Sequence, residues 1–140
     1  MATFDDLDET SEALLFQARD YGLENAGIAA DGFVPFAMVA HDDGQRKLLR
    51  FVADGHDEAV VQARNKLSTV DDDVHCVALT WDGYLTVEGK RSAAVFVEAF
   101  ELGRPAGVLI AQRYKRKRKR IEQVGNAALC DHPAPLSKLR

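Results

Sequence analysis

The strongest chemical signal in this sequence is a run of basic side chains near its C-terminal end. Cations spaced this closely can release the counterions condensed on a nucleic acid, which gives tight, salt-sensitive binding without sequence preference. Tyr114 is the one aromatic residue of the run, and a single ring gives little surface for stacking against the successive bases of a single strand. The run therefore predicts a binding site for nucleic acid or another acidic partner. Its seven bases are Arg113, Lys115, Arg116, Lys117, Arg118, Lys119 and Arg120.

The charge balance of the whole chain supports a second interpretation of this run. Residues 1–112 hold 20 acidic and 9 basic side chains, whereas residues 113–140 hold 2 acidic and 9 basic ones, so the two parts carry −11 and +7. The acidic part can pair with the run, within one molecule or between two copies. Because the bases would point from both faces of a strand, the run is expected to project from the packed body or to lie on an acidic surface such as Asp71–Asp73.

Two of the four histidines stand near acids in a pattern that could hold a metal ion. His41 and His56 are predicted to flank the ends of one strand pair. No HExxH spacing is present, and aspartates beside glycines are ordinary turn residues. Asp71–Asp73 lacks the spacing of a calcium loop and is expected to be solvated. We therefore predict no metal and no cofactor. The acids near the two histidines are Asp42, Asp43, Asp54 and Asp57.

The sequence offers little for nucleophilic catalysis. It has no GxSxG turn and no phosphate-binding glycine loop. Cys76 follows His75, but neighbours in a strand point to opposite faces, so the two do not form a dyad. Glu98 stands between two phenylalanines, where a buried acid would have a raised pKa, although a solvent-facing strand position is the simpler interpretation. We therefore predict no catalytic residues.

The remaining pattern predicts the elements that must position these residues. Apolar residues at helical spacing indicate one helix that begins near Asp8 and a second one after Asp54–Asp57. Alternating and β-branched residues indicate strands, and Asp82-Gly83 is the strongest hairpin signal in the chain. Predicted strands cover residues 33–41, 46–53, 74–81, 84–87, 92–101 and 107–114, a short helix covers 121–129, and an extended tail begins at 131.

These elements predict a single α+β domain with an antiparallel sheet of about five strands and two main helices on one face. The order is α-β-β-α-β-β-β, with a short C-terminal helix as a further option, and late connections are too short for a parallel crossover. Residues 1–120 are expected to form the domain, which ends in a basic strand extension, and residues 121–140 the short helix and a proline-containing tail. In element order and size the chain resembles the roadblock, longin and profilin-like group of small α+β domains. More loosely, it resembles the small acidic dimeric chaperones of bacterial secretion systems.

The composition is that of a folded protein. Apolar residues make up 46% of the chain and charged residues 29%, which excludes a wholly disordered chain. The sequence has no apolar stretch of about 18 residues, and its acidic start lacks the order of a signal peptide. We therefore expect an intracellular, cytoplasmic protein. Cys76 and Cys130 have neither zinc-site nor redox-motif spacing.

Because no catalytic constellation is found, we predict a small interaction or scaffold protein rather than an enzyme. A small sheet leaves an edge to cover, and pairing of two copies into a homodimer is a common remedy. Two alternatives stay open. One is a nucleic-acid-binding protein that uses residues 113–120, and the other is an enzyme or small-ligand sensor with a pocket between helix and sheet.

Overall fold

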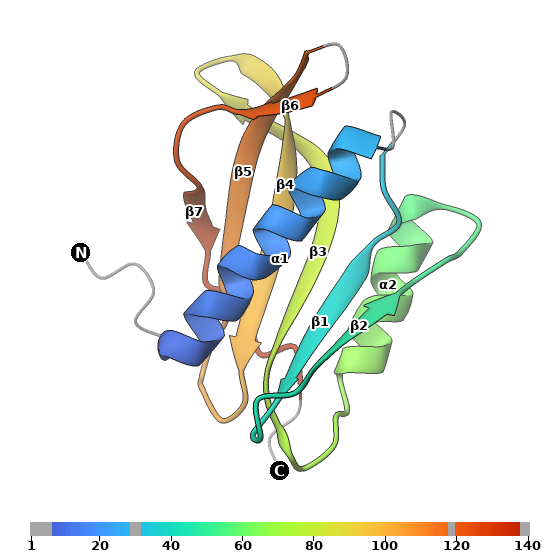
Figure 1. Ribbon diagram of the computed structural model, residues 1–140, viewed down its shortest axis with the longest axis vertical. Helices are drawn as coiled ribbons and strands as arrows, with labels where there is room; N and C mark the ends of the chain where they lie inside the picture. Colours follow the sequence, from blue (N-terminus) through green and yellow to red (C-terminus); the bar gives the residue numbers. More distant parts are fainter. Residues whose placement is uncertain (1–6, 29–31, 118–119, 138–140) are drawn as a thin grey trace.

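The computed structural model describes residues 7–28, 32–117 and 120–137, and these form two helices and seven strands (Figure 1). Neither helix in these ranges combines the length and the apolar character that crossing a membrane requires. The elements are α1 (Glu9–Ile28), β1 (Phe36–His41), β2 (Arg46–Arg50), α2 (His56–Leu67), β3 (Val74–Val87), β4 (Lys90–Glu101), β5 (Val108–Lys117), β6 (Arg120–Gln123) and β7 (Ala128–Asp131).

The strands form one antiparallel sheet, which confirms the predicted α+β class. Its order is β2-β1-β3-β4-β5-β6, and β7 also pairs with β5. The strand count exceeds the expected five because residues 120–131 form β6 and β7 in place of the predicted short helix. Gly125, at φ 69°, interrupts any helix there. The two short strands instead cover the outer edge of β5, whose hydrogen-bonding groups would otherwise lack partners.

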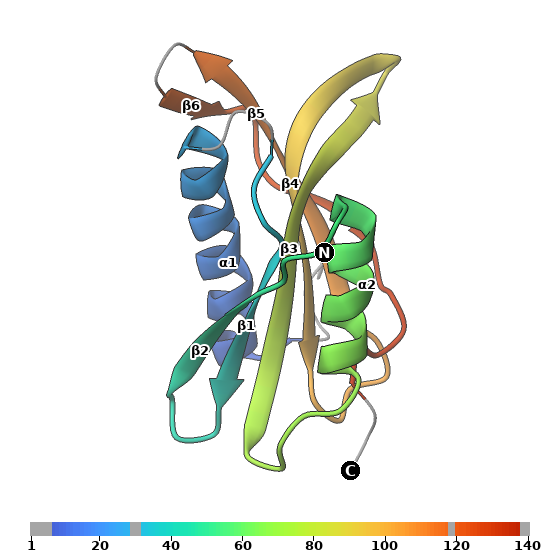
Figure 2. The same cartoon turned by 90° about the vertical axis from the view of Figure 1, so that its right-hand side faces the viewer.

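The two helices cover opposite faces of the sheet, so the prediction that both lie on one face is wrong. Figure 2 shows α1 and α2 on the two sides of the strands. All six residues of β1 are buried. Met38 and Ala40 belong to the core under α1, while Ala37 and Val39 belong to the core under α2. A central strand that is apolar on both faces needs a cover on each, and this sets the three-layer arrangement.

Helix α1 lies very close to the sheet at Gly22. A Cβ atom on this residue would meet Val95 Cγ1 at 2.7 Å and Thr80 Cγ2 at 3.0 Å. Leu14, Leu15 and Ala18 are fully buried along the same helix. Gly22 therefore lies inside the helix, where it allows the helix axis to approach the strands.

Strand β3 continues through the predicted hairpin at Asp82-Gly83. Its pairing with β4 is unbroken as far as Val87↔Lys90. The turn is made by Glu88 and Gly89, at φ 52° and 80°. Positive φ at both central residues is the geometry of the two-residue hairpin turn that matches strand twist. As a result, Asp82 becomes a mid-strand residue.

The C-terminal tail is packed against the body rather than loose. After β7 it crosses to the face covered by α2, where Leu136 is buried in the core with Leu67. The Ser137 hydroxyl donates to the Leu67 carbonyl at the end of α2. The tail thus connects the β5 edge to the far layer of the domain.

Candidate functional site

The basic run forms the ends of β5 and β6, a two-stranded ribbon at one end of the sheet. The pairs Lys115↔Glu122, Arg116↔Ile121 and Lys117↔Arg120 hold it together. Strand β4 pairs with β5 only as far as Arg113, so the ribbon extends beyond the main sheet. Residues 118–119 of the predicted site lie outside the described residues. Of the described bases, Arg113 is half-buried, whereas Lys115, Arg116, Lys117 and Arg120 are exposed.

The root of the ribbon is apolar and packs on α1. Tyr114 is 7% exposed and belongs to the core under α1, with Ile121 packed against the same core. A Cβ on Gly27 of α1 would lie 3.3 Å from Ile121 Cγ1. Burial, followed by the nearby Asp82 charge, raises the pKa of the Tyr114 hydroxyl above its usual range. The run therefore projects only in part, because one face of its root covers a helix.

The exposed part of the ribbon brings like charges together. Lys117 and Arg120 are directly opposite each other, an arrangement that destabilises a strand pair. Glu122 lies on the same face, with its Oε1 atom 3.3 Å from Lys117 Nζ. Glu122 therefore offsets part of the repulsion between the two cations.

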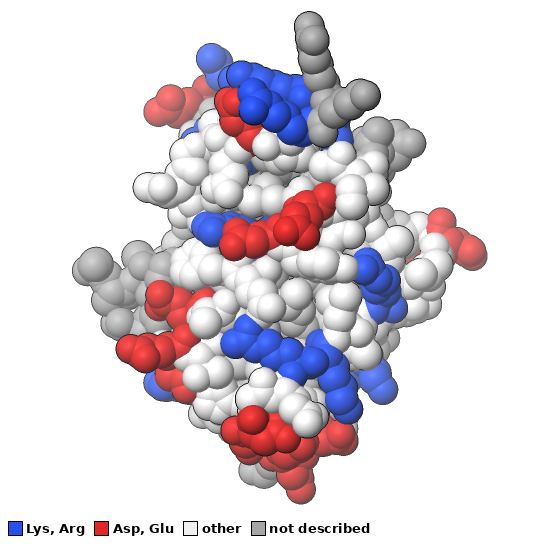
Figure 3. Space-filling model, in the orientation of Figure 1, with Lys and Arg blue, Asp and Glu red and all other residues white. Residues whose placement is uncertain are grey.

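The acidic surface proposed as a partner for the run lies at the other end of the sheet. Glu101 pairs with Cys76 near the start of β3, and Ala94 pairs with Arg113 at the root of the ribbon. These two β4 residues are seven positions apart, or about 23 Å along the strand. Figure 3 shows blue gathered at the β5–β6 end, with some red beside it, and red gathered at the β1–β2 end, with further blue close to it. Asp71–Asp73 is exposed at the acidic end.

A polar network that the sequence did not predict surrounds the start of α1. Asp8 Oδ1 accepts from the Ser11 amide at 2.8 Å and so caps the helix. Glu101 Oε1 accepts from the Asp8 amide at 2.7 Å and the Ser11 hydroxyl at 2.9 Å, and Arg104 Nε donates to Glu101 Oε2. His75 Nε2 lies 2.8 Å from Asp8 Oδ2. Burial by itself would raise the pKa of Asp8, but hydrogen bonds from Ser11 and the adjacent imidazole lower it to about 2.

This network has the residue types of a metal site. One ligand atom each from Asp8, His75 and Glu101 lies within 4.8 Å of the others. All three side chains already take part in the capping hydrogen bonds. The arrangement therefore serves to join the start of α1 to the ends of β3 and β4.

The structure separates the two histidines that were weighed as a metal pair. His41 Nδ1 lies 3.1 Å from Asp73 Oδ2, and His56 Nε2 lies 3.1 Å from Asp82 Oδ1. His41 is opposite Val74 on β3, eight residues from Asp82, which corresponds to about 26 Å. The two rings therefore face different acids at different places along β3.

Glu98 is buried, so its solvent-facing interpretation is wrong. It is 2% exposed on the face covered by α2. Arg64 NH2 of α2 lies 2.8 Å from Glu98 Oε1, and its guanidinium lies 5.6 Å from the centre of the Trp81 ring. Arg64 of α2 thus neutralises the charge of the buried Glu98 carboxylate.

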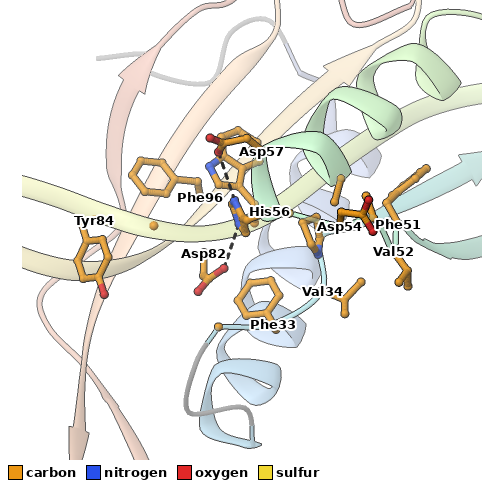
Figure 4. A pocket seen from close by; sticks show the side chains of 17 residues that line it. Phe33, Val34, Phe51, Val52, Asp54, His56, Asp57, Asp82, Tyr84 and Phe96 are labelled. Carbon is orange, nitrogen blue, oxygen red and sulfur yellow. Dashed lines mark ion pairs between the residues drawn. The ribbon is translucent and has the colours of Figure 1, made fainter.

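An open cavity of about 740 Å³ lies at the free edge of β3 (Figure 4). Strand β1 pairs with β3 only as far as Thr80, so the next residues of β3 have β4 as their one strand partner in the described chain. His56 reaches over this edge toward Asp82. A pocket between helix and sheet was an open alternative, but its residues could not be named from the sequence because its walls come from four separate segments. The five rings that line it are Phe33, Phe51, Trp81, Tyr84 and Phe96.

Comparison with protein-family models, with curated proteins and with solved structures gives no match to this chain. The likeness to roadblock-type domains therefore stays a likeness in the order of elements.

Proposed function

We propose that this protein binds double-stranded nucleic acid through the β5–β6 ribbon, largely without sequence preference. The observation that carries the proposal is the placement of Lys115, Arg116, Lys117 and Arg120 on an exposed ribbon beyond the sheet. A two-stranded ribbon is narrow enough to enter the major groove of a duplex. Phosphates on either side of the groove would neutralise the opposed charges of Lys117 and Arg120.

A duplex suits the ribbon better than a single strand does. Proteins that hold single strands stack bases on exposed aromatic rings. Tyr114, the aromatic residue of the run, is buried against α1 and presents no ring to a base. Charge contacts to phosphates remain, and these do not depend on base identity.

The test is a fluorescence-anisotropy titration of a short mixed-sequence DNA duplex at several salt concentrations. If the four exposed bases each contact a phosphate, they contribute about −3 to −4 to the slope of log K (the association constant) against log salt. The triple variant Lys115→Gln/Arg116→Gln/Arg120→Gln should make this slope shallower by about 3 and weaken binding at least tenfold at roughly 0.1 M salt.

Strand β2 supplies a matched control. Arg46, Lys47 and Arg50 are also exposed and lie on the opposite edge of the sheet. Their triple Gln variant has the same net charge as the ribbon variant but should retain the affinity for the duplex. Equal losses in both variants would show attraction by overall charge alone and would contradict the proposal. So would tighter binding of the single strand, or equal binding of an acidic peptide of matched charge.

The homodimer and the intracellular location stay separate predictions. The edge strand β2 carries Arg46, Lys47 and Arg50, and charged edges oppose strand pairing between copies. We therefore expect any dimer to use another surface. Light scattering after gel filtration, at low and high salt, gives the mass directly.

A further inference from the structure

We propose that the cavity at the β3 edge binds a small organic cation, a primary ammonium group carried on an aromatic or other apolar body. This site is distinct from the ribbon and does not depend on the function proposed for it. The inference rests on the charge of the lining, on its rings and on the state of one carboxylate.

The lining charge favours a cation. Asp54, Asp57 and Asp82 all line the cavity, and none of the described lining residues is Lys or Arg. His56 is the one basic group among them. Asp82 is the largely buried acid of the lining, whereas Asp54 and Asp57 are exposed and screened by water. A carboxylate or phosphate ligand would be repelled mainly by Asp82, and an ammonium group would be attracted.

The rings favour an apolar body attached to that charge. Trp81 and Phe96 stack with centroids 5.8 Å apart at an interplanar angle of 6°. Tyr84 is 62% exposed at one side of the cavity, and Val34 and Val52 are exposed at the other. An Arg guanidinium already lies over two of these rings, Arg91 at 3.9 Å from the centre of Tyr84 and Arg64 at 5.6 Å from that of Trp81. The rings therefore supply the apolar surface of the site, and the attraction for a cation comes from the carboxylates. A volume of about 740 Å³ is in the range of small-molecule sites.

Asp82 favours a ligand that donates a hydrogen bond. Its side chain is 19% exposed, and its Oδ1 atom is buried without a hydrogen bond in the described structure. His56 Nε2 lies at ion-pair distance, 3.1 Å, but does not satisfy this oxygen. A buried acceptor without a donor is costly, and an ammonium N–H directed at Oδ1 would remove that cost. A quaternary ammonium has no N–H and could not donate this hydrogen bond.

The chain carries its own reporter for this site. Trp81 is the single tryptophan of the sequence, so intrinsic fluorescence reports on the cavity wall. We would titrate the protein with phenethylammonium and compare phenethyl alcohol, phenyltrimethylammonium and hydrocinnamate, with calorimetry as the second readout. Phenethylammonium should saturate with a Kd of about 0.1–1 mM, which is typical of a ligand of this size. The alcohol and the quaternary ion should bind at least about tenfold more weakly, and the anion should not bind.

Two variants should change the affinity for phenethylammonium in opposite directions. Asp82→Asn keeps the shape of the side chain and should weaken phenethylammonium binding at least about tenfold. His56→Ala removes the resident neighbour of the carboxylate and should strengthen binding. If Asp82→Asn fails to fold, as judged by circular dichroism, His56→Ala still decides the question. Asp20→Asn, an exposed position on α1, is the charge-matched control and should change nothing.

The results that would overturn the proposal are specific. They are equal affinity for the amine and the alcohol, an unchanged Kd in Asp82→Asn, weaker binding in His56→Ala, or no saturable signal from any of the four probes. The duplex titration separates the two proposals, because Asp82→Asn should leave DNA binding intact. Conversely, the ribbon triple variant should bind the amine as the native chain does.

Discussion

The ion pair between Arg64 and Glu98 provides a sharp test of how α2 is held on the sheet. Glu98 is 3% exposed at its side chain, and Arg64 is 43% exposed. Removing one partner of a fully buried pair costs about 3–5 kcal/mol, because the other charge stays desolvated. The exposed guanidinium admits water to this pair, so we expect Arg64→Met to cost roughly 2–3 kcal/mol of unfolding free energy. Methionine retains most of the aliphatic stem and its packing.

A double-mutant cycle separates the charge interaction from the loss of packing. Glu98→Gln alone should cost about 1 kcal/mol, and the double variant should be more stable than the sum of the single effects by roughly 1–2 kcal/mol. Urea unfolding should be followed by far-UV circular dichroism, since the Arg64 guanidinium lies 5.6 Å from the Trp81 ring and would alter its fluorescence directly. Lys66→Met, an exposed change on the same helix, should stay within about 0.5 kcal/mol of the native chain. Additive single effects, within about 0.5 kcal/mol, would refute the reasoning.

Three further predictions follow from the contacts described above. Gly22→Ala should lower the unfolding free energy in urea by about 1–3 kcal/mol despite alanine's higher helix propensity, because the new Cβ would meet Val95 Cγ1 at 2.7 Å. A neutral effect would mean that α1 can shift. Asp8→Asn should cost roughly 1 kcal/mol of unfolding free energy at pH 7, a value discounted because the Asp8 side chain is 39% exposed. Folding lowers the pKa of this carboxyl from 3.8 to about 2, so its contribution to stability is complete above pH 3.8 and is lost as the pH falls through 2. The difference between the two proteins should therefore vanish in unfolding curves below pH 2, and a constant difference would contradict this origin. In mass spectrometry after brief alkylation, Cys130 should be labelled first, because Cys76 is 1% exposed and burial raises its thiol pKa to about 11; equal labelling rates would contradict this.

The fold class was predictable because local patterns carry it. Helical spacing and strand alternation located both helices and most strands, and short connections gave the antiparallel sheet. The placement of the helices was also within reach, since the unbroken apolar stretch Phe36–Ala40 indicates a strand buried on both faces. The expectation of both helices on one face rested on element order and short connections, which do not show which face each helix covers.

The place of Asp82 in the cavity could not be predicted, because the local sequence Asp82-Gly83 favours a turn instead of a strand. Asp82-Gly83 has a strong intrinsic preference for a turn, but the ladder with β4 extends the strand to Val87 and places the turn at Glu88-Gly89. Tertiary pairing overrides local propensity in such cases. Glu98 is a similar case, because its burial depends on Arg64, which is 34 positions away in the sequence. The basic run was evident, but its buried Tyr114 was not.

The described charges have a dipole component along the strands, because Asp71–Asp73 precedes β3 at one end and the ribbon lies at the other, with β3 itself extending about 43 Å. Arg46 and Lys47 near the β1–β2 turn and Glu88 at the β3–β4 turn oppose this component and reduce it. In the field of a polyanion such a molecule experiences a torque that turns the ribbon forward. At physiological salt this field decays over about 8 Å, so reorientation is confined to the last stage of approach. Two molecules lying side by side would have their lowest electrostatic energy when antiparallel, and the dipole moment itself can be measured by transient electric birefringence.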